Sequence, residues 1–190
     1  LPALVALAVV YFVSGIVLRA KEAWSFVLRN SALILGGLVS FAALMFGQES
    51  GGWFVLVIGL LFAAETYLRK NGWLEIGAPV FFSLGALLIL RSFDVERIPY
   101  HLLIYSLIWL LGDVLTHLTF AHPRPLKVIV RLIGGLLTCI NYGFLFGDNN
   151  PVIAAGGFAV YTLLFLTISL LYRQPNLFYA FTLTLPLFVT

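Results

Sequence analysis

An aspartate and a histidine, Asp113 and His117, stand four residues apart inside a long apolar stretch of the sequence. On a helix this spacing places both side chains on one face, where a carboxylate and an imidazole can pair. Ionisable groups inside apolar segments are rare and often form proton relays or polar contacts with a partner protein. The plainer interpretation, which we favour, is a local Asp–His pair near the cytoplasmic end of the segment.

Glu65 and Arg69 form a second pair with the same spacing, and Glu75 follows within ten residues. An arginine one turn from a glutamate can pair with it while its charged head reaches toward water. Glu75 and Lys70 extend this group into an acidic cluster beside basic residues. We interpret Glu65 and Arg69 first as a paired boundary motif and, as the alternative, as part of a transport site.

The depths of Glu65 and Asp113 are similar. Counted at 1.5 Å per residue from Trp53 and Leu102, where their apolar segments begin, Glu65 lies about 18 Å deep and Asp113 about 17 Å deep. The sequence thus predicts an intramembrane polar level formed by Glu65, Asp113 and His117.

Metal and cofactor chemistry has little support in the sequence. His101 and His122 flank the segment that carries His117, so the three histidines are not expected to share one metal. Cys139 is the single cysteine, which excludes an intrachain disulfide, and we expect it to be a small buried apolar residue. We predict no metal and no cofactor, although bound lipids would fit this composition.

Helix packing has its own candidates. The pairs Gly36-Gly37 and Gly134-Gly135 are small residues that allow helices to approach closely in a membrane. Asn141 can donate and accept hydrogen bonds across helices, so we expect it to join neighbouring helices. The glycines could alternatively line a groove for a lipid or a pigment.

The overall composition shows what kind of fold must position these residues. Of the 190 residues 62% are hydrophobic and only 10% are charged, and the mean hydropathy is +1.05. A water-soluble fold of this length needs more polar surface. The apolar stretches are continuous rather than alternating, which favours spanning helices over barrel strands. We therefore predict an all-α, polytopic membrane helix bundle.

Turn-forming residues separate about eight apolar stretches, each near the length of a membrane-spanning helix. The expected helices are 3–18, 25–46, 53–68, 73–90, 102–120, 127–146, 152–172 and 177–190.

Basic residues predict the orientation. Nine of the eleven fall in the first, third, fifth and seventh connections or beside them, and only Arg91 and Arg97 fall on the other side. The nine are Arg19, Lys21, Arg29, Arg69, Lys70, Arg124, Lys127, Arg131 and Arg173. Because basic residues are retained in the cytoplasm, these connections are expected there and the N-terminal end outside. The acidic residues Glu49, Asp94, Glu96 and Asp148 are expected on the outer side.

The two halves resemble each other weakly, which predicts a parallel tandem repeat of four helices. Gly36-Gly37 and Gly134-Gly135 occupy matching places in this alignment, and each half has a proline in its last segment. An even number of helices per unit preserves orientation. The expected units are residues 1–98 and 99–190. Because the sequence begins at Leu1 and ends within an apolar stretch, we expect it to be part of a longer polypeptide.

These patterns leave three functional classes open. The first is a non-catalytic membrane subunit or scaffold that packs against other membrane proteins, and we favour it because buried charge is scarce and loops are short. The second is a transporter or channel segment that uses the polar level. The third, an enzyme acting on lipid-linked substrates, is less favoured because no hydrolase, zinc-peptidase or P-loop motif occurs. The expected partners are the lipid bilayer, in a bacterial-type inner membrane, and other subunits, but no nucleic acid.

Overall fold

The computed structural model describes residues 1–46, 50–69, 72–119, 126–173 and 175–189. These described residues form α-helices joined by short turns and contain no strand. The α-helices are α1 (Pro2–Val17), α2 (Glu22–Phe46), α3 (Gly51–Arg69), α4 (Gly77–Ser92), α5 (Ile98–Thr119), α6 (Lys127–Phe146), α7 (Pro151–Tyr172) and α8 (Pro175–Val189). Two 3₁₀ helices, η1 (Leu18–Ala20) and η2 (Gly72–Ile76), follow α1 and precede α4.

The helix positions agree closely with the apolar stretches of the sequence. Helix α6 begins and ends at the predicted residues, and most other boundaries lie within a few residues of the prediction. The largest shifts are at the starts of α5, which begins at Ile98 rather than Leu102, and of α4, which begins at Gly77 after η2 rather than at Trp73. This start places Pro79 in the first turn of α4, where its missing N–H costs no helical hydrogen bond.

Within the described residues, seven helical stretches are long and apolar enough to cross a membrane. They run from Pro2–Ala20 to Pro151–Tyr172. Helix α8 has 15 residues, fewer than the roughly 17–25 residues of a typical spanning helix. The chain is therefore an all-α protein whose described part has seven candidate membrane spans and one shorter apolar helix.

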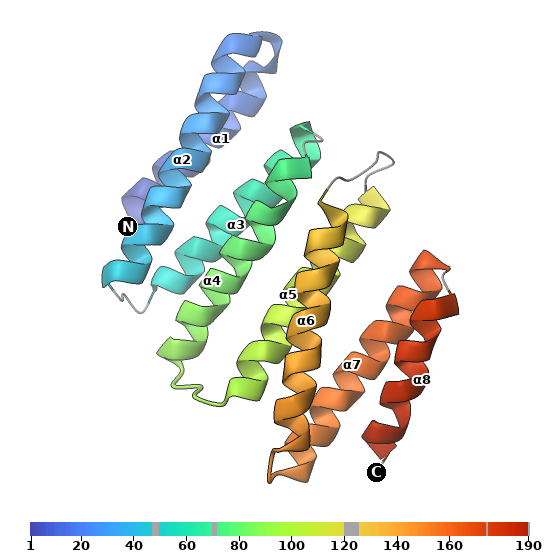
Figure 1. Cartoon of the computed structure of the whole chain (residues 1–190). Helices are drawn as coiled ribbons and strands as arrows, with labels where there is room; N and C mark the ends of the chain where they lie inside the picture. The colour runs from blue at the N-terminus through green and yellow to red at the C-terminus, as the bar shows by residue number, and fades with distance from the viewer. Residues whose placement is uncertain (47–49, 70–71, 120–125, 174, 190) are drawn as a thin grey trace.

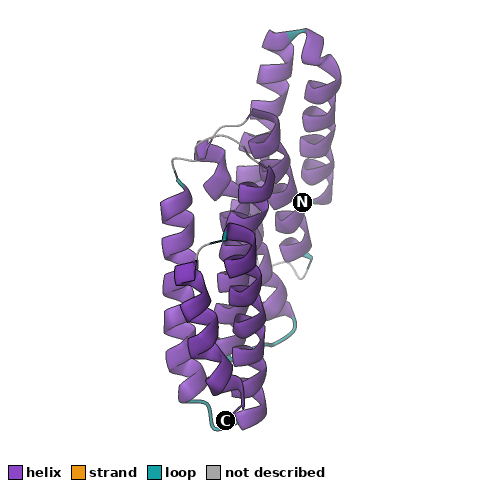
Figure 2. Cartoon of the chain, turned by 90° about the vertical axis from the view of Figure 1, so that its right-hand side faces the viewer, coloured by secondary structure: helices purple, strands orange, loops and turns teal. Residues whose placement is uncertain are grey.

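Consecutive helices pair as antiparallel hairpins. Helix α1 packs along α2, α3 along α4, α5 along α6 and α7 along α8. Figure 1 shows these hairpins side by side in chain order, from the blue pair to the red pair. In the perpendicular view of Figure 2 the helices still run roughly along one direction. The result is an extended array in which each hairpin contacts mainly the next.

The array separates charge between its two ends. The turns within hairpins lie at one end, which we call the basic end, and the described basic residues there are Arg19, Lys21, Arg29, Arg69, Lys127, Arg131 and Arg173. Lys70 and Arg124, also predicted there, lie outside the described residues. The connections between hairpins lie at the opposite end with Asp94, Glu96 and Asp148. Glu49 lies outside the described residues.

Only one glycine of each predicted pair makes a close helix contact. A Cβ atom at Gly36 would lie 2.8 Å from Cγ2 of Ile58 in α3, and one at Gly134 would lie 2.8 Å from Leu110 in α5. A Cβ atom at Gly37 or Gly135 would meet no described atom within 4 Å. Gly37 and Gly135 therefore face away from the described helix contacts, because adjacent helical residues point about 100° apart, and their packing role stays a prediction.

The four-helix tandem repeat stays a prediction. Gly36 faces α3, the helix that follows its own, whereas Gly134 faces α5, the helix that precedes it. The two glycines that suggested the alignment thus belong to different kinds of interface, one between hairpins and one within a hairpin.

Cys139 is exposed on the outer surface of α6. The expectation that it is buried is wrong, because apolar composition does not show which helix face points toward lipid. In a membrane chain the outward face is as apolar as the core.

Candidate functional site

Three acidic residues are buried near the basic end, each at the boundary between two consecutive hairpins. We call Glu65, Glu75 and Asp113 the junction carboxylates. Their exposed fractions are 0%, 4% and 3%. Charged groups are almost never fully buried unless they are paired. Their partners therefore indicate what each group does.

At the first junction, Glu65 of α3 contacts two arginines. Arg69 lies one turn further along α3 and forms an ion pair with Glu65. Arg29 of α2 approaches the other carboxylate oxygen, with 3.7 Å between its Nη1 and Oε2 of Glu65. Arg69 also donates a hydrogen bond of 2.8 Å to Oδ1 of Asn30, and its guanidinium lies over the ring of Phe26, 4.9 Å from the ring centre. The first two hairpins are thus joined by one anion shared between two cations.

At the third junction, Asp113 of α5 binds residues from two further helices. Nε of Arg131 in α6 donates to Oδ2 of Asp113 over 2.7 Å. The hydroxyl of Tyr172 in α7 donates to the same oxygen over 2.6 Å. The guanidinium of Arg131 also lies 4.5 Å from the centre of the Tyr172 ring. Asp113 therefore connects the third hairpin to the fourth.

His117 stands next to this cluster. Its ring lies 4.2 Å from the ring of Tyr172, centre to centre, and it is exposed at the surface. The spacing rule predicted His117 as the partner of Asp113, and the described contacts of Asp113 are with Arg131 and Tyr172. Helical spacing identifies neighbours on one helix, whereas these two partners come from other helices.

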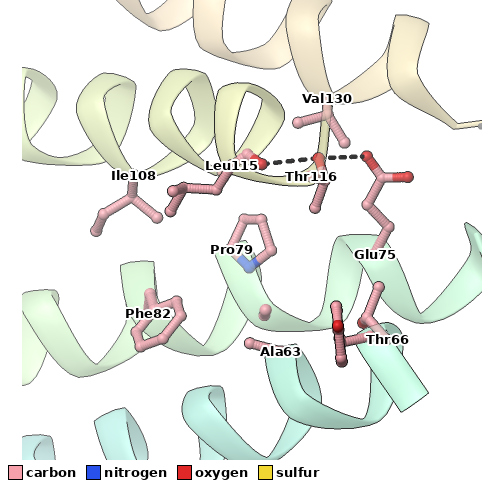
Figure 3. Close-up of a pocket in the computed structure, with 12 residues that line it drawn as sticks. Ala63, Thr66, Glu75, Pro79, Phe82, Ile108, Leu115, Thr116 and Val130 are labelled. Carbon is pink, nitrogen blue, oxygen red and sulfur yellow. Dashed lines mark hydrogen bonds between the residues drawn. The ribbon is translucent and has the colours of Figure 1, made fainter. Parts of the chain in front are cut away.

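At the second junction, Glu75 lies in η2, and Oγ1 of Thr116 in α5 stands 3.3 Å from its Oε1. Figure 3 shows both side chains at one end of a cavity of about 220 Å³. Apolar side chains that include Pro79, Phe82 and Ile108 line most of this cavity. This junction therefore has a buried carboxylate beside a partly open cavity.

The predicted polar level is divided among separate junctions. Glu65 pairs with α2 and α3, whereas Asp113 pairs with α6 and α7. Within the described part of the chain, no group of three His, Cys, Asp or Glu residues could hold a metal ion. The depths of Glu65 and Asp113 along their helices are similar, but depth does not determine lateral distance across the array.

Of the other histidines, His101 contacts Tyr105 and the Val95 carbonyl, and His122 lies outside the described residues.

A second polar contact joins the same helices deeper in the array. Nδ2 of Asn141 in α6 donates to the Tyr161 hydroxyl of α7 over 2.9 Å, and this hydroxyl lies 2.8 Å from Oγ of Ser106 in α5. All three residues have an exposed fraction of 0%. Asn141 therefore makes the interhelical contact expected of its side chain, and its partners are residues that the sequence analysis did not select.

Sequence reasoning missed most of the partners in these junctions. Arg29 and Arg131 were counted only as indicators of orientation, and Tyr172 was not selected. One available signal was position, because Arg29 and Arg131 fall inside helices rather than in the turns. A charged residue one or two turns within a spanning helix usually has a partner.

Comparison with known proteins gives no family, because no protein-family model, no curated protein and no solved structure matches this chain. The fold and the seven apolar spans define the class as a multi-pass, all-helical membrane protein.

Proposed function

We propose that this chain is a non-catalytic membrane scaffold, an array of helical hairpins that packs against other membrane protein subunits. The observation that carries the proposal is that each junction between hairpins contains one buried carboxylate whose contacts cross the junction. The cross-junction contacts are Glu65–Arg29, Glu75–Thr116 and Asp113–Tyr172. They act as links between units rather than as a reaction centre.

The chemistry of these links suits a fixed role. A buried carboxylate in direct contact with an arginine forms an ion pair, and removing either partner leaves an uncompensated buried charge. Arg131 and Arg69 each provide such a charge within direct contact. A transport site, by contrast, needs groups that gain and lose an ion or a proton in every cycle.

The surface of the array is consistent with membrane partners. Large apolar side chains are exposed along the helices, among them Leu38, Leu132 and Leu183 with exposed fractions of 63%, 65% and 72%. In a bilayer these faces contact lipid or neighbouring subunits. We infer from the distribution of basic residues that the basic end faces the cytoplasm of a bacterial-type inner membrane and that the start of α1 lies outside. The proposal involves no cofactor.

The alternative function is transport through Glu65, Asp113 and His117. It requires water to reach the carboxylates, and the cavities described in this fold do not include Glu65 or Asp113 among their lining residues. An enzyme acting on lipid-linked substrates is the third class, and the arginine-paired carboxylates provide no acid–base pair for it.

One substitution distinguishes scaffold from transporter. Asp113→Asn keeps the size of the side chain and removes the charge that holds Arg131. A suitable control is Asp94→Asn at the opposite end, because Asp94 is exposed with φ of 51°, a left-handed conformation that asparagine also adopts readily. Both variants are reconstituted in liposomes, and the free energy of unfolding and the flux of protons and of small ions are measured.

If the chain is a scaffold, Asp113→Asn lowers the free energy of unfolding by about 3–5 kcal/mol, whereas Asp94→Asn changes it little. Neither the wild-type protein nor either variant then carries a flux above that of empty liposomes. A wild-type flux that Asp113→Asn abolishes while stability stays unchanged would overturn the scaffold proposal in favour of transport.

A further inference from the structure

An open pocket lies beside the turn of the first hairpin, where η1 joins α1 to α2 (Figure 1). Its volume of about 570 Å³ falls within the roughly 300–1,000 Å³ of sites for drug-sized ligands. The described residues that line it are Arg19, Glu22, Ala23, Ser25, Phe26 and Arg29. The junction carboxylates are not among them, so the pocket is a separate feature of the basic end.

The first turn of α2 forms one wall of this pocket. The N–H of Ser25 donates to the carbonyl of Lys21 over 3.0 Å, so the helical hydrogen bonds of α2 begin at that residue. The N–H groups just before it, including that of Ala23, have no partner within the helix. Such N–H groups form the positive end of the helix dipole, and they favour an anion placed against them.

The hydroxyl of Ser25 is a second donor at the same place. The Ser25 side chain is buried, with an exposed fraction of 4%, and it lines the pocket. The hydroxyls of Ser40 and Thr66, on the same kind of helix, donate to the carbonyl one turn earlier. Within the described part of the chain the Ser25 hydroxyl makes no hydrogen bond. Because a buried polar group without a partner costs free energy, this hydroxyl favours an acceptor in the pocket.

Two arginines bring positive charge to the pocket. Arg29 follows Ser25 by one turn and lies on the same face of α2, whereas Arg19 belongs to η1. Nη1 of Arg29 approaches Oε2 of Glu65 only to 3.7 Å, which is longer than a hydrogen bond. A guanidinium carries five N–H donors, so Arg29 can bind a further acceptor while it stays beside Glu65.

The net charge around the pocket is positive. The charged residues that line it or contact Arg29 or its partner Glu65, together with the adjacent Lys21, are the cations Arg19, Lys21, Arg29 and Arg69 and the anions Glu22 and Glu65. Four cations and two anions leave a net charge of +2. Glu22 is exposed, so solvent screens its charge, and it weakens the attraction for an anion without cancelling it.

The position of the pocket favours an anion that belongs to a lipid. The candidate span Pro2–Ala20 ends beside it, and the candidate span Glu22–Phe46 begins there. Trp24 and Phe26 have exposed fractions of 63% and 57%, and Trp is enriched at the level of the lipid headgroups. Basic pockets between spanning helices bind anionic headgroups. A lipid phosphate can therefore reach the pocket while its acyl chains lie along the apolar helix surface.

We propose that this pocket binds the phosphate group of an anionic phospholipid. Arg19 and Arg29 contact the phosphate as cations, and the hydroxyl of Ser25 donates a hydrogen bond to one of its oxygens. The site is independent of the scaffold proposal, because a transporter with the same first hairpin has the same pocket.

Lipid titration followed by native mass spectrometry tests the site. The chain in dodecylmaltoside micelles is titrated with dioleoylphosphatidylglycerol and, separately, with dioleoylphosphatidylcholine, and the Kd of the first bound lipid is measured. We expect phosphatidylglycerol to bind about tenfold more tightly, because the choline cation is repelled by the net positive charge of the pocket. Glycerol 3-phosphate at the same concentration as the lipid should not displace it. Displacement would identify a soluble phosphate ester as the ligand and would refute the lipid assignment.

Matched variants assign the binding to the pocket. Arg19→Gln should weaken phosphatidylglycerol binding about fivefold, and Ser25→Ala about tenfold, since one hydrogen bond to a charged group is lost. Glu22→Gln should have the opposite effect and strengthen binding, because it removes the competing carboxylate. Lys127→Gln is the control, since it removes an exposed cation at the same end but outside the pocket, and it should leave the Kd unchanged. Arg29 is kept, because it also contacts Glu65.

Three outcomes would rule out the site. They are equal affinity for the two lipids, equal weakening by Arg19→Gln and Lys127→Gln, and weaker binding by Glu22→Gln. Arg19, Glu22 and Lys127 are exposed, so we expect these variants to keep the helical circular dichroism of the wild type. The test therefore stays decisive even where Ser25→Ala disturbs the packing of α2.

Discussion

The hydroxyl of Tyr172 donates a hydrogen bond of 2.6 Å to Oδ2 of Asp113, the same oxygen that accepts from Arg131. The bond connects the last residue of α7 to the buried carboxylate of α5. It also keeps the phenol ring under the guanidinium of Arg131. One aspartate oxygen thus links the third hairpin to the fourth.

Tyr172→Phe removes this donor and keeps the ring. We expect the free energy of unfolding, measured by SDS titration in mixed micelles with circular dichroism, to fall by about 1–2 kcal/mol, because a buried carboxylate loses one of its donors. Tyr179→Phe is the control, since Tyr179 is exposed by 67%. An equal decrease in the free energy of unfolding in the two variants would show that the hydrogen bond to Asp113 makes no specific contribution to stability.

Glu65→Gln leaves Arg29 and Arg69 without their shared counter-charge. Two unpaired cations near a buried position are costly, so we expect the free energy of unfolding in the same SDS titration to fall by about 3–5 kcal/mol. Glu96→Gln provides the comparison, because it makes the same chemical change at an exposed site. A Glu65→Gln variant as stable as Glu96→Gln would show that the first junction does not depend on this ion pair.

Gly36→Ala and Gly37→Ala should have opposite effects, although the two residues are adjacent. A Cβ atom at position 36 meets the fully buried Ile58, so we expect Gly36→Ala to destabilise the chain by about 1–3 kcal/mol. At position 37 the added methyl group has open space, and the higher helix propensity of alanine makes the change neutral or slightly stabilising. Gly134→Ala and Gly135→Ala repeat the comparison in the third hairpin. Similar thermal unfolding temperatures for the two members of each pair would contradict the packing.

Labelling of single cysteines tests the placement of the two ends. In a Cys139→Ser background, Lys21→Cys and Arg173→Cys should react with an impermeant maleimide only when the cytoplasmic side is accessible, as in inverted vesicles. Glu96→Cys should react from the outer side in intact cells. The expectation follows from the excess of basic residues at one end, and reaction of Lys21→Cys and Glu96→Cys from the same side would refute it.

The sequence alone determined the class of fold and the limits of most helices. Continuous apolar stretches must form helices in lipid, since every backbone polar group needs a partner within its own segment. Turn residues then separate one helix from the next, so that the predicted segment 127–146 and helix α6 coincide. The spacing of four residues also placed Glu65 next to Arg69, because helix periodicity is a local property.

Tertiary structure alone decided which residues meet across hairpins. Asp113 could be placed on its helix from the sequence, but its partners Arg131 and Tyr172 are 18 and 59 residues away. The same holds for the contact of Glu75 with Thr116 and for the cavity beside them. Helical periodicity fixes the depth and the face of a residue, whereas the lateral order and rotation of helices depend on non-local packing. In a membrane the outward and inward faces are both apolar, so composition gives no signal for that rotation.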